Sequence, residues 1–282
     1  RGLLYQVSHW GAAFGPVVFL LHVWMDSSAS LQFVVEALQG RWHVIAPDWR
    51  GYGVSQWLNH PYWFPDYLAD LDFLLDHFAQ GQEIHLVGHS LGGNVAMIYA
   101  GIRPQRIRRL VNLEGFGMPA TRPEQAPGRY AKWMDDLQHL HRGELEMRAY
   151  DTIDGVARRL MKTNPRLGQD KANWLAQHWA AQDADGKWRI LGHAAHKVAS
   201  AHLYQVEETL ALYRKLSMPV LCVEASDNSM DFWWKGKYTL AQYHERLKQV
   251  PSAEIALIAD AGHMLHHDQP EMLAQLIESF IV

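Results

Sequence analysis

The chain has 282 residues, of which 48% are hydrophobic and 20% are charged, and its formal net charge is −4 at pH 7. This composition is that of an ordinary globular protein, and the slightly acidic balance argues against a nucleic-acid partner or a membrane surface held by charge. Cys222 is the single cysteine, so no internal disulfide forms. No apolar stretch is long enough to span a membrane and the first residues lack a signal-peptide core, so a cytoplasmic protein is the default expectation.

Strands and helices alternate along the first part of the chain. Residues 3–7 alternate weakly and predict a first strand, and residues 17–21 form a continuous apolar run typical of a central parallel strand. The same patterns predict strands at 42–46, 83–87 and 107–113, and helices at 29–38, 66–78 and 94–100. This alternation predicts an α/β fold with a mostly parallel sheet and helices on both of its faces.

The alternation stops between residues 117 and 216, where the sequence contains no convincing strand. Helices are predicted there at 129–140, 153–161, 172–181 and 206–215, and beyond it come strands at 219–223 and 254–258 and helices at 238–248 and 272–280. We therefore expect a core made of residues 1–116 and 217–282, with residues 117–216 inserted as a helical cap. Ligands of open α/β sheets bind at the carboxyl ends of the strands, so an insertion after a strand end lies over the site.

Residues 88–93 read Gly-His-Ser-Leu-Gly-Gly and lie between a predicted strand and a predicted helix. Gly-x-Ser-x-Gly in this context is a nucleophile elbow, a sharp turn that exposes a serine at the end of a strand. Gly88 and Gly92 leave room for the turn, and Ser90 is the predicted nucleophile. The helix that follows directs backbone N–H groups at the same point, where they stabilise an anion.

A serine nucleophile needs a general base, and the base needs an acid that orients it. In elbow-type enzymes these residues follow one another in the order serine, acid, histidine. His263 is the candidate base and Asp227 the candidate acid, since each comes just after one of the late strands. Glu114, just after an earlier strand, is the alternative acid, and Glu224 is a weaker one.

The chain resembles an α/β-hydrolase fold protein of the cap-bearing branch with a serine nucleophile, which includes esterases, C–C hydrolases and proline iminopeptidases. The matching stretches span nearly the whole chain except the cap, and they are His22 with Asp48-x-Arg50-Gly51-x-Gly53-x-Ser55, residues 88–93, Pro219 to Asp227, and Gly262-His263 to Pro270-Glu271. The resemblance implies eight strands in the sheet and an oxyanion hole made by the backbone N–H groups of Trp24 and Leu91. Ser90 excludes the haloalkane dehalogenase and epoxide hydrolase chemistries, which need an aspartate at the elbow.

Two positions depart from the family pattern. The family usually has His-Gly where this chain has His22-Val23. If the backbone there needs a positive φ, Val23 is strained by about 1–3 kcal/mol and the Trp24 N–H points away from the site. Losing one oxyanion donor costs roughly 100–1,000-fold in rate, so Val23 is either an adaptation or a substitution that weakens activity. Glu224 stands where the family often has Gly, and it either competes for His263 or stays solvated.

The substrate pocket is harder to predict, because aromatic residues of a cap more often pack in a core than line a cavity. The candidate lining residues are His22, Val23, Met118, Trp133 and Met134. For His22 we favour a structural role, as a hydrogen-bonding residue beside the oxyanion hole. The histidine spacings match no zinc motif and no phosphate-binding glycine loop is found, so we expect neither a metal nor a cofactor.

These residues predict a cofactor-independent serine hydrolase that cleaves a small or medium carboxylic ester through an acyl-enzyme on Ser90. An aromatic-rich cap favours a hydrophobic acyl or alcohol group, so the expected partner is a small hydrophobic ester or a related carbonyl compound. One alternative uses the same triad on another bond, as a C–C hydrolase, a lyase or a proline iminopeptidase-like aminopeptidase. The other is a ligand-binding homologue with low turnover, for which Val23 is the sequence support.

Overall fold

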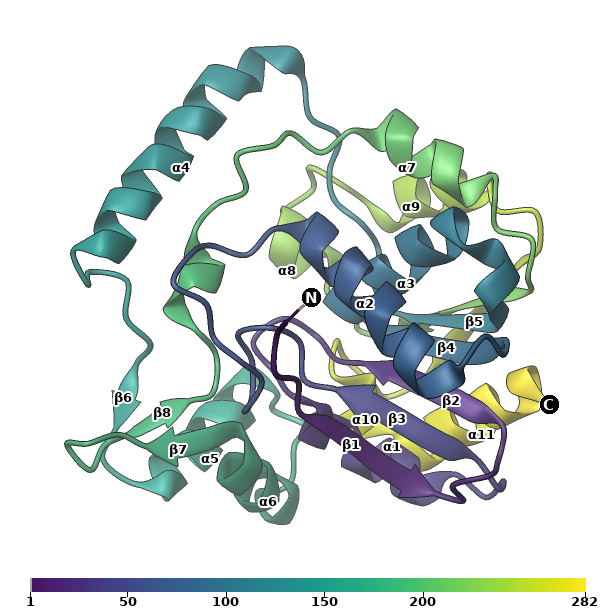
Figure 1. The fold of residues 1–282 in the computed structure, drawn as a ribbon, viewed down its shortest axis with the longest axis horizontal. Coiled ribbons are helices and arrows are strands. Elements are labelled where there is room, and N and C mark those ends of the chain that lie inside the picture. Colours follow the sequence, from purple (N-terminus) through teal and green to yellow (C-terminus); the bar gives the residue numbers. More distant parts are fainter. Residues whose placement is uncertain (1) are drawn as a thin grey trace.

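Seven strands form the main sheet of the chain (Figure 1). The computed structural model describes residues 2–282, and Arg1, the first residue of the predicted core, lies outside them. In spatial order the strands are β1 (Val7–Gly11), β3 (His43–Pro47), β2 (Val17–Leu21), β4 (Ile84–His89), β5 (Ile107–Leu113), β9 (Val220–Ala225) and β10 (Ala253–Ile258). β1 is antiparallel to β3, and the other neighbouring strands are parallel.

The expectation of eight strands is therefore wrong over the described residues. The first strand also begins later than predicted, at Val7 rather than near Leu3. The reason is that the preceding residues pair with a loop, since the Leu4 carbonyl oxygen accepts from Gln56 N–H at 2.9 Å and the Gln6 carbonyl oxygen accepts from Asp48 N–H at 2.9 Å.

Helices cover both faces of the main sheet, as the alternation of strands and helices predicts. One face carries α2 (Phe64–Ala79), α3 (Leu91–Ile102), α7 (Val206–Tyr213), α8 (Met230–Trp234) and α9 (Leu240–Leu247). The other carries α1 (Gln32–Ala37), α10 (Leu265–Asp268) and α11 (Pro270–Ile281). Short 3-10 helices complete the chain at η1 (Ser28–Leu31), η2 (Pro104–Arg106), η3 (Pro123–Gln125) and η4 (Ala194–Lys197). None of the described helices is long and apolar enough to cross a membrane.

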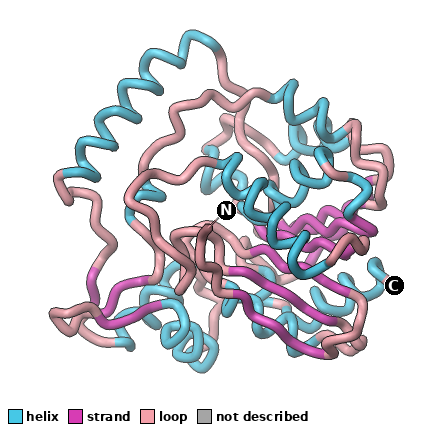
Figure 2. The backbone as a smooth tube through the Cα atoms, viewed as in Figure 1, coloured by secondary structure: helices cyan, strands magenta, loops and turns pink. Residues whose placement is uncertain are grey.

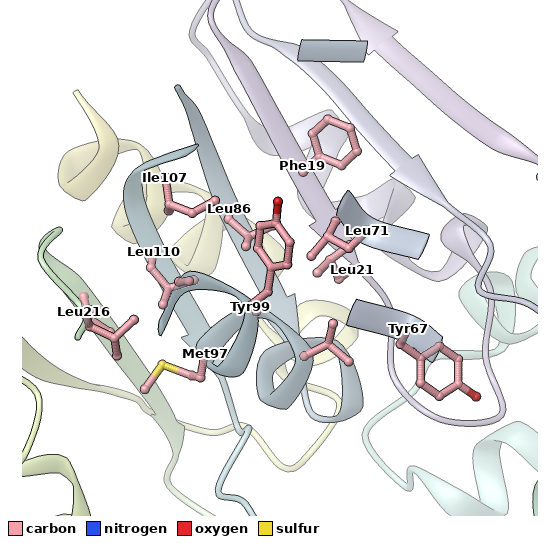
Figure 3. Close-up of a cluster of buried hydrophobic side chains, with 14 of the residues drawn as sticks. Phe19, Leu21, Tyr67, Leu71, Leu86, Met97, Tyr99, Ile107, Leu110 and Leu216 are labelled. Atoms are coloured by element: carbon pink, nitrogen blue, oxygen red, sulfur yellow. The ribbon is translucent and has the colours of Figure 1, made fainter. Parts of the chain in front are cut away.

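The core consists of two buried layers separated by the sheet. Successive residues of a strand point to opposite faces, so Phe19 and Leu21 of β2 pack in one layer and Val18 and Leu20 in the other. Figure 3 shows the first of these layers, where Tyr99 of α3 packs among side chains of the sheet and of α2. A strand buried on both faces has to be apolar throughout, which explains the continuous run at 17–21.

The inserted segment, residues 117–216, contains α4 (Ala126–His141), α5 (Ile153–Thr163), α6 (Gln169–Trp179) and α7, near the four helices predicted there. It also contains a three-stranded antiparallel sheet made of β6 (Ala149–Tyr150), β8 (Trp188–Ile190) and β7 (Ala180–Gln182), which Figure 2 shows as a separate group of strands. The expectation that this segment has no strand is wrong, because strands of two or three residues are too short to produce a recognisable alternation.

The two ends of the inserted segment differ in how closely they pack on the core. α4 stands out from the rest of the molecule (Figure 1), and Asp136 is its single buried residue. α7 packs closely on α3 in the core, since a Cβ atom at Gly101 would lie 2.6 Å from the Leu212 carbonyl oxygen and Tyr213 belongs to the main buried cluster. The small core of the segment lies between α5 and α6, around Val156 and Leu175.

Candidate active site

The carboxyl ends of the parallel strands meet at one edge of the main sheet. Residues at or near these ends are paired across the sheet as Leu21 with Gly88, His89 with Leu113, Leu113 with Val223, and Ala225 with Ile258. The predicted oxyanion segment, the serine, both candidate acids and the candidate base each follow one of these strand ends. The strand order thus brings these segments to a common edge, where ligands of such sheets bind.

Ser90 occupies a sharp turn between β4 and α3. Its φ of 51° and ψ of −107° are rare for an L residue and cost about 1–3 kcal/mol. The Ser90 N–H donates to the Leu113 carbonyl oxygen at 2.8 Å, which ties the turn to β5. A Cβ atom at Gly88 would lie 2.3 Å from the Gly92 carbonyl oxygen, and one at Gly92 would lie 2.2 Å from the Leu21 carbonyl oxygen. This is the strained geometry that the Gly-x-Ser-x-Gly pattern predicts.

Glu114 lies directly after β5, and its fully buried carboxylate faces His263. Glu114 Oε2 accepts from His263 Nδ1 at 3.2 Å. The same carboxylate accepts from the backbone N–H of Ala225 at 2.9 Å and from the hydroxyl of Ser229 at 3.2 Å. A buried carboxylate needs such donors to offset the loss of water, and here they also hold it in one orientation. Glu114 itself has a positive φ of 53°.

Asp227 makes no hydrogen bond to His263. Its side chain is 70% exposed and pairs with Arg166 of the inserted segment, with Oδ2 3.2 Å from Nη1. The prediction of Asp227 as the orienting acid is therefore wrong in this structure, and the alternative, Glu114, has that position. The physical reason is that the loop after β9 turns its backbone N–H groups toward the Glu114 carboxylate, while the Asp227 side chain points to solvent.

Neither of the two expectations for Glu224, competition for His263 or a solvated side chain, is met. It is buried, and its Oε1 lies 2.6 Å from Nε2 of His244 on α9. Because Glu224 is paired with that histidine, it neither competes for His263 nor stays solvated.

His263 lies beside the elbow. Its carbonyl oxygen accepts from His89 Nε2 at 2.7 Å, and the centroids of the two rings are 4.9 Å apart. His263 Nε2 is buried and has no hydrogen-bond partner among the described residues. With Nδ1 held by Glu114, Nε2 is the nitrogen left to take the proton of a neighbouring hydroxyl, such as that of Ser90.

A group of buried histidines packs against His89 of the elbow. Ser30 Oγ lies 2.9 Å from His266 Nε2 and 2.8 Å from His267 Nε2, and the ring of His266 packs 4.6 Å from that of His89. Burial lowers the pKa of His89 and of His266 well below the ordinary value and that of His267 to about 3, so these rings stay neutral. Within residues 2–282, no group of three or more histidine, cysteine or acidic side chains is placed to hold a metal ion.

The segment after β2 has its positive φ at Met25, where φ is 58°, and not at Val23. The strain expected at Val23 is therefore absent, and its side chain is simply buried, with 7% exposed. The Met25 carbonyl oxygen accepts from the indole Nε1 of Trp179, at the end of α6, at 2.9 Å. This bond fixes the backbone next to Trp24, one predicted oxyanion donor. Leu91, the other, is the first residue of α3, so its N–H has no partner within the helix.

His22 is held on both sides of its ring. Nδ1 donates to the Val23 carbonyl oxygen at 2.7 Å, and Nε2 accepts from the Trp49 N–H at 2.8 Å. Burial lowers the pKa of His22, so the ring stays neutral. Since both nitrogens are occupied and only 1% of the residue is exposed, His22 links two loops and offers no nitrogen to a substrate.

The remaining residues predicted to line the pocket do not gather at one place. Trp133 and Met134 lie on α4, and Met134 and Met118 are exposed. Sequence reasoning missed the apolar side chains on α8, of which Trp233 has its ring centroid 6.5 Å from that of His263. No sequence pattern singled out Trp233, because α8 is short and no helix was predicted at its position.

The inserted segment is bonded to the loop that carries His263. Asn164, just after α5, donates through Nδ2 to Asp268 Oδ1 at 2.6 Å. The other oxygen of Asp268 accepts from the Gly262 N–H at 2.8 Å. The segment therefore contacts the loops of both the candidate base and the candidate oxyanion donor.

The strained serine, the paired histidine and the carboxylate are the features of an elbow-type hydrolase. The α/β hydrolase fold family matches residues 16–270, and the chain belongs to it. A serine hydrolase-like protein of Danio rerio is 24% identical over 280 residues, which cover 96% of this chain and 83% of the relative. Among solved structures, the thioesterase domain from the curacin biosynthetic pathway has a TM-score of 0.81 at 22% identity, covering 98% of this chain and 96% of its own. An esterase from Mycobacterium tuberculosis has a TM-score of 0.71 at 19% identity, covering 99% of this chain and 92% of its own.

Replacing the carboxylate that faces His263 tests the corrected acid. We expect Glu114→Gln to lower kcat for p-nitrophenyl butyrate by about 10³–10⁴-fold, as the loss of the orienting carboxylate of a triad does. Asp227→Asn is the matched control, because it removes a carboxylate charge from an exposed position, and we expect kcat within about threefold of the wild type. A larger loss in Asp227→Asn than in Glu114→Gln would return the acid role to Asp227.

The backbone at position 23 gives a second prediction. Since Val23 has no positive φ, Val23→Gly relieves no strain, and we expect kcat not to rise. The variant loses a buried side chain, so its free energy of unfolding in urea falls by about 1.5–3 kcal/mol. A large increase in turnover would show that valine distorts the oxyanion segment after all.

The indole of Trp179 gives a third prediction. Trp179→Phe keeps an aromatic ring in the small core but removes the N–H that binds the Met25 carbonyl oxygen. We expect kcat to fall about tenfold, the value of one hydrogen bond, with little change in KM, because the oxyanion segment acts in the transition state. Trp188→Phe, a partly buried tryptophan of the same core, is the control. Equal losses in the two variants would mean that packing, and not this hydrogen bond, accounts for the effect.

Proposed function

We propose that the protein is a cofactor-independent serine hydrolase that cleaves a small or medium carboxylic ester. Ser90 Oγ attacks the ester carbonyl carbon while His263 Nε2 takes the hydroxyl proton, and Glu114 holds the imidazole in the required tautomer. His263 then returns the proton to the departing alcohol, which leaves the acyl group on Ser90. A water molecule, deprotonated by the same nitrogen, attacks the acyl-enzyme and releases the carboxylic acid.

Charge that develops on the carbonyl oxygen needs hydrogen-bond donors at a fixed position. We assign these donors to the backbone N–H groups of Leu91 and Trp24. Leu91 starts a helix, where free N–H groups and the helix dipole favour an anion. The register of β2 on β4 sets Leu21 beside Gly88, which favours a position for Trp24 close to the elbow.

The observation that carries the proposal is the pair of Glu114 and His263 next to the strained Ser90. The carboxylate is fully buried, it is held by its own donors, and it leaves Nε2 of the histidine buried and without a partner. This arrangement suits a general base whose imidazole receives a proton on Nε2 and is stabilised as a cation by the carboxylate at Nδ1. The esterase and hydrolase names of the relatives agree with this chemistry.

An apolar acyl or alcohol group suits the surroundings of His263. Trp233 lies near its ring, and Trp233, Phe232 and Trp24 leave 50%, 74% and 43% of their surfaces exposed. Exposed aromatic side chains bind apolar groups at low entropic cost. We propose that the part of the inserted segment before α7 serves as the cap over this region.

Rapid-mix kinetics with p-nitrophenyl butyrate tests the acyl-enzyme. We expect a burst of p-nitrophenol equal in amount to the enzyme, and no burst and negligible turnover in Ser90→Ala, because alanine has no nucleophilic oxygen. Ser279→Ala, an exposed serine on α11, is the control and keeps the burst. Turnover that survives in Ser90→Ala would reject Ser90 as the nucleophile, and a wild type inactive on aryl esters would reject the ester assignment.

A further inference from the structure

A second concave site lies on the inserted segment and shares no residue with the site around Ser90. It is a cavity of about 350 Å³ between the β6 region and α5. Four of the side chains that line it are cationic, and they are Arg148, Arg158, Arg159 and Lys162. A site of this volume is at the lower end of the size range of small-molecule pockets, roughly 300–1,000 Å³.

The helical period brings three of these cations together. Gly155, Arg158, Arg159 and Lys162 are spaced three, four and seven residues apart, which places them on one face of α5. The opposite face is buried in the small core, where Val156 is fully buried. Gly155 adds no side chain to this face. The apolar face thus fixes the rotation of the helix and turns the cationic face toward the cavity.

Among the described residues, these cations are not paired with carboxylates. Asp151, the carboxylate in the cavity wall, forms an ion pair with Lys187, with Oδ1 2.5 Å from Nζ. Within residues 2–282, no ion pair is formed by Arg148, Arg158, Arg159 or Lys162. Like charges four residues apart on a helix, such as Arg158 and Lys162, repel each other, so this arrangement is stabilised by an anion.

The walls of the cavity also favour a particular kind of anion. The guanidinium of Arg148 lies over the ring of Tyr150, 5.3 Å from its centroid, which limits its freedom. Guanidinium groups present parallel N–H donors that match two oxygens of a phosphate. We propose that this cavity binds a soluble phosphate ester or diphosphate, a role that is independent of the proposed ester hydrolysis.

Titration calorimetry with sodium pyrophosphate at constant ionic strength tests the site. We expect saturable binding to the wild-type protein and a Kd at least tenfold higher for the double variant Arg158→Gln/Lys162→Gln. Both side chains are exposed, so an unchanged urea midpoint is expected and shows that the variant is folded. The control is Lys215→Gln/Lys237→Gln, which removes the same charge from exposed positions outside the cavity and keeps the wild-type Kd.

Three results would overturn the proposal. The first is an absence of saturable binding of pyrophosphate to the wild type. The second is an equal loss of affinity in the two double variants, which would mean a general effect of net charge. The third is binding to phosphatidylglycerol vesicles, but not to pyrophosphate, with phosphatidylcholine vesicles as the reference, because the anion would then be a lipid headgroup. Burst kinetics on each variant separates this site from the ester chemistry, since the burst is expected to be unchanged.

Discussion

The contact between the buried Glu114 carboxylate and His263 constrains more of this structure than any other. A carboxylate withdrawn from water is costly unless donors surround it. Here the donors come from the end of β9, from the loop that follows it, and from the loop after β10. Those three segments come together only if β5, β9 and β10 lie side by side and parallel, as they do. The pair therefore depends on the topology of the sheet as much as on the two side chains.

Much of the core could be predicted from the sequence, because local patterns determine it. The continuous apolar run at 17–21 coincides with β2, which is buried on both faces, and the strand predicted at 107–113 coincides with β5. The elbow could also be predicted, since Gly88 is required by a close contact with Gly92, only four residues further along the chain. The start of β1 could not, because it depends on hydrogen bonds from the loop after β3 to residues near Leu4.

The acid partner could not be chosen from the sequence for a similar reason. Asp227 and Glu114 both follow strand ends, and the sequence does not show that Arg166, distant along the chain, binds Asp227. A sequence motif also gives no backbone angles, so it left open whether Val23 has a positive φ, and the positive φ occurs at Met25. Both Asp227 and Met25 contact the inserted segment, through Arg166 and through the indole of Trp179.

These contacts give the inserted segment a part in the geometry of the site. Asn164 is bonded to Asp268, which is bonded to the loop of His263, and Trp179 is bonded to the oxyanion segment. The candidate base and the candidate oxyanion donor lie on different loops of the core, and the inserted segment contacts both loops. A shift of this segment therefore changes both loops together. For that reason we treat the segment as part of the scaffold of the candidate site, as well as its proposed cap.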